Sequence, residues 1–335
     1  MIIESSAPTR VDLAGGTIDI WPLYLFHPGA TTVNFALSLR AHCRIETRDD
    51  DRIILESRDR KVIFETRVNR LEELFREEQL ELIAKLVHFF KPTTGFHLTA
   101  YSEAPAGAGL AGSSALNIAC VGALNRLVGN RYGERKFVTV AANVETTVIK
   151  VPAGFQDYYP ALHGSVSCLH FRADGIEREA LDVNAAELES RMAICYTGEP
   201  RLSGINNWEI FKRHIDGDRE LFQMFESIRD SAIHIRKALL ADDWARVAAS
   251  MRQAHPNRKQ LAPNITTPQM DALIEKALAS GAEAVKVCGA GGGGCIAFLC
   301  AEGKKSQVES ALAEVQGVEV LDWKIAREGL VIREE

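Results

Sequence analysis

Alternating hydrophobic and polar positions in the first third of the chain predict β-strands. Such runs cover residues 10–13, 37–47, 52–56 and 61–66, and a polar turn at 57–60 joins the last two. A further strand is expected at 96–101, just before a glycine-rich stretch. The first third is therefore expected to be rich in β-structure.

Helical periodicity marks three segments between these strands and the middle of the chain. Apolar residues recur at the 3.6-residue period over 71–90, which predicts an amphipathic helix. Residues 114–127 are apolar nearly all round, as expected of a buried helix. Residues 137–149 predict a third helix, ended by Pro152 and Gly154.

The second half of the chain begins with another strand. We place the boundary between two expected domains, 1–182 and 183–335, just before this strand. Pro256 and Pro263 are expected to break a long helical stretch over 218–255, and Thr267 with Pro268 marks the start of a helix that stops at Gly281. The remaining expected elements are a strand at 191–196, strands at 284–288 and 295–300, a helix at 304–315 and strands around 319–326.

Composition and charge narrow the classes of function. The 335 residues are 46% hydrophobic and 25% charged, which is typical of a soluble globular protein with room for about two domains. A net charge of −6 without a basic block argues against a nucleic-acid surface and favours small ligands. No segment suits a membrane span, and the N-terminus lacks the basic and apolar regions of a signal peptide. A cytoplasmic location is therefore expected. The protein is also expected to be a monomer or a homodimer.

The seven cysteines form no C-x-x-C pair, and several lie inside apolar runs. This pattern predicts reduced, buried thiols.

Ten of the 25 glycines fall in three short clusters, at 15–16, at 107, 109 and 112, and at 289 and 291–294. A glycine-rich turn that leads into a helix can bring backbone N–H groups and the positive end of the helix dipole to a phosphate. The second cluster has this form, because the expected helix at 114–127 follows it. Any single cluster is equally compatible with a tight turn that binds nothing.

Two better-known phosphate motifs match these clusters only superficially. Gly107, Gly109 and Gly112 spell G-x-G-x-x-G, but a dinucleotide fold needs the motif directly after a strand and a second strand after the helix. A P-loop needs Lys and Ser or Thr after the last glycine, where this chain has Ser113-Ser114. An NAD(P)-dependent oxidoreductase and a P-loop enzyme are both disfavoured.

Taken in order, three segments resemble the motifs of the galactokinase, homoserine kinase, mevalonate kinase and phosphomevalonate kinase (GHMP) superfamily. They are residues 7–19 (APTRVDLAGGTID), 105–115 (PAGAGLAGSSA) and 286–295 (KVCGAGGGGC). The resemblance implies a two-domain α+β fold, with a ribosomal S5 domain 2-like N-terminal domain and a ferredoxin-like C-terminal domain. It also implies that ATP and an acceptor bind in the cleft between them.

The resemblance assigns ATP and Mg²⁺ to the second motif. Ser113 matches the serine offered to Mg²⁺, with Ser114 in reserve, and Glu145 matches the glutamate that completes the metal site. Gly112 stands where relatives usually have serine. Without the resemblance, the alternative interpretation of Glu145 is an acid on a solvated helix face. The expected ATP-binding residues are Pro105, Gly107, Ala108, Gly109, Leu110, Ala111, Gly112, Ser113 and Ser114.

The segment 152–159 (PAGFQDYY) resembles the G-x-Q-D-x-Y of sugar-kinase relatives. Asp157 is therefore the expected catalytic base for the acceptor hydroxyl, with Gln156 beside it in the acceptor site. Arg10 matches the basic residue of the first motif, which would keep the aspartate ionised and offset charge on the moving phosphoryl group. A surface arginine at a strand edge is the alternative for Arg10.

The first motif resembles the A-G-G-G-T-D of the heptose-phosphate kinase and fucokinase branch, with Thr17-Ile18 in place of Gly-Thr. Residues 196–203 (YTGEPRLS) and Lys259 agree with that branch. The expected acceptor-binding residues are Gly16, Thr17, Asp19, Gln156, Arg201, Gly291 and Gly292. If the acceptor carries a phosphate, Arg201 or Lys259 is expected to line its pocket.

The sequence thus predicts an ATP-dependent kinase that phosphorylates a hydroxyl, expected to be anomeric, of a sugar or sugar phosphate. Mevalonate or another small alcohol is the alternative acceptor. A ligand-binding sensor of the same fold is the alternative of another class, disfavoured because Arg10, Ser113, Glu145 and Asp157 are all present.

Overall fold

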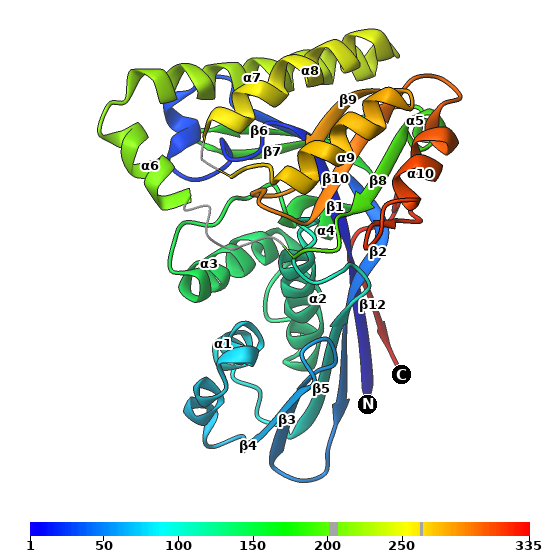
Figure 1. Ribbon diagram of the computed structural model, residues 1–335. Helices are drawn as coiled ribbons and strands as arrows, with labels where there is room; N and C mark the ends of the chain where they lie inside the picture. The colour runs from blue at the N-terminus through cyan, green and yellow to red at the C-terminus, as the bar shows by residue number, and fades with distance from the viewer. Residues whose placement is uncertain (201–206, 262–263) are drawn as a thin grey trace.

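All the strands of residues 1–180 belong to one large sheet of eight strands (Figure 1). The computed structural model describes residues 1–200, 207–261 and 264–335. The order of the sheet is β12-β1-β2-β5-β3-β4, and β6 and β7 continue it from β2. Its strands are β1 (Ile2–Ala14), β2 (Thr31–Thr47), β3 (Arg52–Ser57), β4 (Val62–Arg67), β5 (Phe96–Ser102), β6 (Val166–Arg172), β7 (Gly175–Ala180) and β12 (Val331–Glu334).

Strands β1 and β2 are longer than the sequence pattern predicts. Both begin well before residues 10 and 37, and residues 31–37 of β2 are all buried. A strand that is buried on both faces shows no alternation of hydrophobic and polar residues, so its period is invisible in the sequence. Residues 31–35 of β2 pair with β6, and residues 41–47 pair with β5.

Four helices of the first half are α1 (Glu81–Phe90), α2 (Gly112–Leu127), α3 (Phe137–Ile149) and α4 (Tyr158–His163). Helix α2 is buried nearly all round, as predicted, and packs with α1, α3 and the sheet in one core. The helix predicted over 71–90 begins only at Glu81. Two 3₁₀ turns, at Leu71–Arg76 and Glu78–Leu80, replace its first half. The Glu77 side chain accepts the Gln79 N–H and so caps the second turn locally.

The second sheet has the order β11-β8-β10-β9, the arrangement of a ferredoxin-like domain. Its strands are β8 (Met192–Tyr196), β9 (Ala282–Val287), β10 (Cys295–Cys300) and β11 (Glu319–Val320). Helices α9 (Pro268–Ala279) and α10 (Lys305–Ala313) share a core with one face of the sheet, including Ile296 and Phe298. Alternate residues such as Ala297 and Leu299 face a second core that reaches the large sheet.

Helices α7 (Arg219–Leu240) and α8 (Trp244–Leu261) replace the single helix predicted over 218–255. The chain turns at Asp242, which has a positive φ of 52°, and Asp243 then accepts the Arg246 N–H as a cap of α8. Helix α8 continues past Pro256, where the prediction placed a break. The sequence did not predict the turn at Asp242, because no glycine or proline lies there. Helices α5 (Ala185–Arg191) and α6 (Asn207–Ile215) complete the fold.

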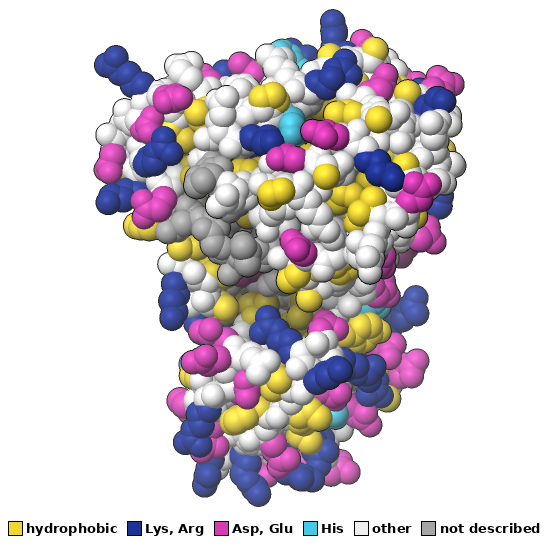
Figure 2. Space-filling view, in the orientation of Figure 1, with side chains coloured by type: hydrophobic (Ala, Val, Ile, Leu, Met, Phe, Trp, Pro, Cys, Tyr) yellow, Lys and Arg dark blue, Asp and Glu magenta, His cyan; other side chains and the backbone are white. Residues whose placement is uncertain are grey.

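The C-terminal strand β12 returns to the large sheet and pairs with β1 beside the N-terminus (Figure 1). All seven cysteines are buried and none is in a disulfide, as predicted. Basic and acidic side chains are interspersed over the face shown in Figure 2. None of the described helices is long and apolar enough for a transmembrane span.

Candidate active site

A small cleft of about 100 Å³ brings together residues from five segments of the chain. They come from β1, the turn after it, the segment before α4, helix α8 and the third glycine cluster. The lining residues are Arg10, Asp12, Gly16, Thr17, Asp19, Ile20, Gly154, Gln156, Asp157, Arg258, Gly289 and Ala290. Six of the residues predicted for catalysis or acceptor binding therefore share one cavity.

Arg10 and Asp157 form an ion pair at the wall of this cleft. The Arg10 Nε and Nη2 groups both donate to Asp157 Oδ1, at 2.9 and 2.6 Å. Burial disfavours the charge on Arg10, but Asp157 and Asp12 outweigh burial and raise its pKa overall. Because both hydrogen bonds use one oxygen, Asp157 Oδ2 keeps its lone pairs for another partner. The side chain of Asp157 is 27% exposed, so this oxygen can be reached from the cleft.

Asp19 and Gln156 offer acceptor atoms in the same cleft. The two Asp19 oxygens each accept one backbone N–H, from Thr17 and Gln156, both at 3.0 Å. Burial, with a smaller contribution from Asp157, raises the pKa of Asp19 to about 7. The Gln156 Oε1 atom is buried and has no partner among the described residues. Donors such as hydroxyl groups would satisfy both side chains.

The second glycine cluster forms a loop that ends at the N-terminus of α2. In the described part of the chain, the backbone N–H groups of residues 109–114 donate to no other protein group. The Arg10 Nη1 group donates to the Gly109 carbonyl at 2.9 Å, which ties this loop to the ion pair with Asp157. Free N–H groups at a helix N-terminus favour an anion, so the loop is suited to phosphate.

Glu145 of α3 meets the loop at its two serines. Ser113 Oγ donates to Glu145 Oε1 at 3.2 Å, and Ser114 Oγ donates to Oε2 at 3.2 Å. Tyr158 donates its hydroxyl to the same Oε2 at 2.7 Å. Burial raises the pKa of Glu145, and no cationic side chain is among the causes of its shift. The solvated-face interpretation of Glu145 is therefore wrong, since only 9% of the residue is exposed. A buried carboxylate beside two hydroxyls, without a cation, fits a site for Mg²⁺.

The third glycine cluster packs directly on the phosphate loop. A β-carbon at Gly109 would lie 2.6 Å from the Cys288 carbonyl oxygen, and one at Gly294 would lie 2.8 Å from the Ala108 carbonyl oxygen. The Cys295 N–H donates to that same Ala108 carbonyl at 2.7 Å. Glycine is needed here because the two backbones touch.

Some predicted acceptor residues lie elsewhere. Gly291 and Gly292 approach the backbone of Ile265 instead of lining the cleft, where Gly289 and Ala290 of the same cluster are found. Lys259 is exposed and pairs with Asp271 at 2.9 Å. Arg201 lies outside the described residues.

Three charged residues of the site escaped the sequence analysis. Lys286 pairs with the buried Asp12 at 2.8 Å, beneath the cleft. Arg258, next to Lys259 in the chain, lines the cleft. The motifs containing Asp12 and Lys286 were visible, but nothing in the sequence showed that the two side chains meet. For Arg258 the only signal was its place beside Lys259.

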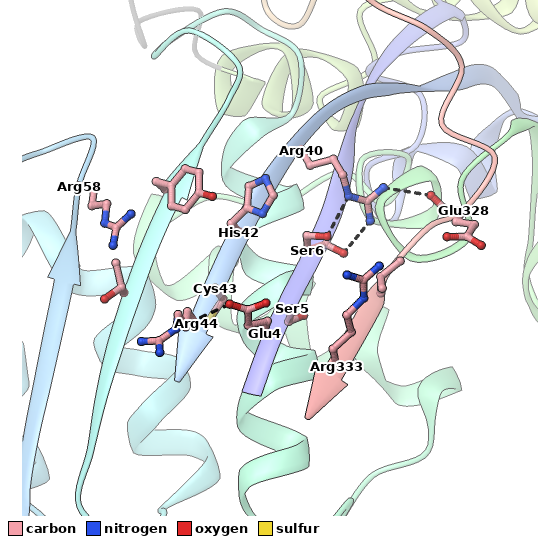
Figure 3. A pocket seen from close by; sticks show the side chains of 13 residues that line it. Glu4, Ser5, Ser6, Arg40, His42, Cys43, Arg44, Arg58, Glu328 and Arg333 are labelled. Atoms are coloured by element: carbon pink, nitrogen blue, oxygen red, sulfur yellow. Dashed lines mark hydrogen bonds and ion pairs between the residues drawn. The ribbon is translucent and has the colours of Figure 1, made fainter. Parts of the chain in front are cut away.

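Two other features lie away from this cleft. A hollow of about 520 Å³ on the large sheet is lined by residues of β1, β2 and β12, and contains none of the predicted site residues (Figure 3). There Arg40 donates to Ser6 and to the Glu328 carbonyl. Cys168, His170 and Glu179 also lie close together, but Glu179 is already bound by both arms of Arg236.

The comparisons with known proteins agree with the fold. The family model described as GHMP kinases N terminal domain matches residues 77–165, and the model of the GHMP kinases C terminal domain matches residues 235–317. Together they match just over half of the chain. The protein therefore belongs to the GHMP kinase family and is an ATP-dependent kinase.

Individual relatives cover the whole chain. A D-glycero-alpha-D-manno-heptose 7-phosphate kinase of Campylobacter jejuni is 27% identical over 341 residues, covering 98% of each chain. A mevalonate kinase of Thermococcus sibiricus is 25% identical and covers 100% of this chain and 99% of its own. A solved D-glycero-D-manno-heptose 1-phosphate kinase of Bacteroides thetaiotaomicron superposes with a TM-score of 0.76 at 23% identity, covering 99% of each chain. This structural likeness concerns the fold.

Proposed function

We propose that this kinase transfers the γ-phosphoryl group of Mg·ATP to the anomeric hydroxyl of a sugar or sugar phosphate. The observation that carries the proposal is the cleft itself, which is lined by Asp157 with its free oxygen, by Asp19 and by Gln156. Several hydrogen-bond acceptors in one small cavity match a ligand that carries several hydroxyl groups. The C. jejuni relative named as a heptose 7-phosphate kinase supports the same acceptor class.

Asp157 would act as the general base. Its Oδ2 atom would accept the proton of the acceptor hydroxyl while Arg10 holds Oδ1. Arg10 also contacts the phosphate loop through Gly109, so its charge lies between the base and the phosphates. There it would offset the negative charge of the phosphoryl group in transfer.

The phosphate loop would hold ATP through residues 105–114, with the free N–H groups of 109–114 directed at phosphate oxygens. Ser113 and Glu145 would hold Mg²⁺, which would neutralise charge on the phosphates. Ser114, Asn117 and Tyr158 donate to Glu145 and keep its carboxylate in place beside the loop.

An acceptor screen tests this proposal. ADP release is measured with the full chain, Mg·ATP and a panel of free hexoses, heptoses and uronic acids, their phosphates, and mevalonate. Turnover of a sugar or sugar phosphate with a kcat/KM at least tenfold above that of mevalonate is expected. Preference for mevalonate or another simple alcohol, or no turnover of any sugar, would overturn it. NMR of the product identifies the phosphorylated hydroxyl.

A further inference from the structure

Thr17 has a backbone conformation that is costly for its residue type. Its φ is 84°, in the left-handed region that β-branched residues rarely adopt, and the residue is only 8% exposed. Such strain persists where the surroundings enforce it, and it often coincides with a functional contact. The position is also where this chain departs from the A-G-G-G-T-D pattern of the branch it resembles.

The contact made by Thr17 is with Arg258 of α8. The Arg258 Nη1 group donates to Thr17 Oγ1 at 2.5 Å, and Nη2 donates to the Gly289 carbonyl at 3.0 Å. The strained threonine and the third glycine cluster thus hold the guanidinium at the wall of the cleft. A guanidinium has five N–H donors, so three remain after these two bonds.

Within the described part of the chain, the charge of Arg258 is balanced only from a distance. The other cations around the cleft are paired, Arg10 with Asp157 and Lys286 with Asp12. Among the described residues, no carboxylate lies within ion-pair distance of Arg258, although Asp12 and Asp19 act on it from further away. A half-buried guanidinium with unused donors attracts an anion, and its planar fork matches a phosphate or carboxylate.

We propose that Arg258, positioned by Thr17, is the subsite for an anionic group on the acceptor, a phosphate or a carboxylate. The inference rests on the proposed sugar kinase function and deepens it, because it predicts an acceptor that already carries a negative charge. The rival explanation is that Arg258 only fastens α8 to the turn after β1 and to the third glycine cluster. The two explanations differ in whether the effect of removing Arg258 on kcat/KM depends on the charge of the acceptor.

Matched acceptors and a neighbouring control separate these explanations. We compare kcat/KM for a sugar phosphate, the same sugar without phosphate, and the corresponding uronic acid, in the wild type, Arg258→Gln and Lys259→Gln. The wild type should prefer a charged acceptor, and Arg258→Gln should reduce that preference about 30-fold, as for loss of a hydrogen bond to a charged group. Lys259→Gln removes an adjacent cation that lies outside the cleft, and should retain the preference. Titration calorimetry of the charged acceptor without ATP should show the same weakening.

Variants of Thr17 test its positioning role. Thr17→Val keeps the β-branched shape and the backbone strain but loses the hydroxyl, whereas Thr17→Ser keeps the hydroxyl. Thr17→Val should lower the preference for the charged acceptor, and Thr17→Ser should preserve it. The Thr17→Val and Arg258→Gln effects should be non-additive in the double variant, because both break the same contact.

The outcomes also separate this inference from the proposed function. A wild type that prefers the uncharged sugar, or an Arg258→Gln variant that loses the same factor on charged and uncharged acceptors, overturns the subsite and leaves the sugar kinase intact. If only a non-sugar alcohol is phosphorylated, the proposed function fails. The charged and uncharged forms of that alcohol then decide the subsite by the same ratio. Whether the phosphate or the uronate is preferred identifies the anion.

Discussion

At the residue scale, the two oxygens of Asp157 have different partners, because Arg10 binds Oδ1 and leaves Oδ2 to accept a proton. This difference leads to a first prediction. Asp157→Asn keeps an oxygen for Arg10 but replaces the proton-accepting oxygen with an amide that cannot take up a proton. We expect kcat to fall about 1,000-fold, within the usual range for a general base. Because Asp157 lies outside the phosphate loop, the affinity for a non-hydrolysable ATP analogue, measured by calorimetry, should change less than threefold. Retention of full kcat would contradict the assignment of Asp157 as the base.

Asp19 leads to a second prediction, on the pH dependence of stability. Its pKa is about 7 in the folded protein, above the ordinary value of 3.8 for an aspartate, so the folded state binds more protons than the unfolded state between these pH values. Stability contributed by this group is therefore present at low pH and is lost as the pH rises through 7. Asp19→Asn removes this titration. Relative to the wild type, the variant should gain on the order of 3 kcal/mol between pH 4.5 and pH 8, because each pKa unit between pH 4.5 and the folded pKa of about 7 contributes about 1.4 kcal/mol.

Urea denaturation of both proteins at the two pH values measures that difference. Comparing the change between pH values cancels the hydrogen bond that Asn loses to one of the two backbone N–H groups at every pH. A difference that does not vary with pH would show that Asp19 titrates normally. The same variant should lower kcat/KM for a sugar acceptor, because it weakens a hydrogen-bond acceptor in the cleft.

Motif resemblance named single candidate residues where the motif lies in a short segment, and their roles stay predictions. Asp157, Arg10, Asp19 and Gln156 were all named from such segments, and the structure brings them into one cleft. Arg258 was not, since α8 reaches the cleft only through tertiary packing, and its partner Thr17 is 241 positions away. Arg258 faces the cleft, whereas the next residue, Lys259, does not. The sequence pattern near Pro256 did not show which of these two side chains lies on the cleft side of the helix.

At the element scale, the pattern of hydrophobic positions predicted elements wherever one face is buried and the other is solvated. The helix at Phe137–Ile149 has the predicted bounds, and the strand predicted over 52–56 is Arg52–Ser57. The strand at Cys295–Cys300 is buried on both faces and was still predicted, as a short apolar run after a glycine cluster. Predictions failed at two other segments. Residues 31–37 are buried on both faces, and residues 71–80 form 3₁₀ turns.

The close contact between the two glycine loops leads to a third prediction. Gly109→Ala places a methyl group 2.6 Å from the Cys288 carbonyl oxygen, at a φ of +76°. The two loops must separate, so we expect an unfolding free energy lower by about 3 kcal/mol and an ATP KM raised at least tenfold, in line with overpacking plus left-handed strain.

Gly129→Ala is the matched control for that variant. Its φ of +80° carries the same backbone penalty, but an added β-carbon would meet nothing within 4 Å. It should cost about 1 kcal/mol, from backbone strain alone, and leave kcat/KM unchanged. Urea denaturation and steady-state kinetics of both variants provide the measurements. Equal costs for the two would mean that the loops do not need their close approach.

At the scale of the whole molecule, the candidate active site depends on the packing of one half of the chain on the other. Arg10 and Asp157 come from the first half, whereas Arg258 and Gly289 come from the second, and all line one cleft. The chain then crosses back, because β12 adds to the edge of the large sheet. Nothing in the composition of the last residues predicted this return, since the pairing is between the two ends of the chain. The domain boundary near residue 182 stays a prediction. Strand β12 follows that boundary in the sequence, but it belongs to the sheet of the N-terminal half.

This return of the chain leads to the last prediction. Strand β12 pairs with residues 3–6 of β1, and Leu330 and Ile332 pack on the surface of α2 at Gly122. Deletion of residues 331–335 exposes that edge and the apolar surface beneath it. The unfolding free energy should fall by about 2–4 kcal/mol, through lost backbone hydrogen bonds and burial.

The catalytic cleft should be spared by this deletion, because β12 pairs with the far end of β1 from Arg10. In urea, the unfolding midpoint of the deletion variant should drop, whereas kcat/KM measured at 15 °C should stay within threefold of the wild type. Ile332→Ala, which removes apolar contact but keeps the strand, should show a smaller loss of stability. If the deletion lowers kcat/KM in proportion to stability, the two ends of β1 are coupled and the large sheet transmits changes at its edge to the cleft. If the midpoint does not move, the terminal strand contributes nothing to the fold.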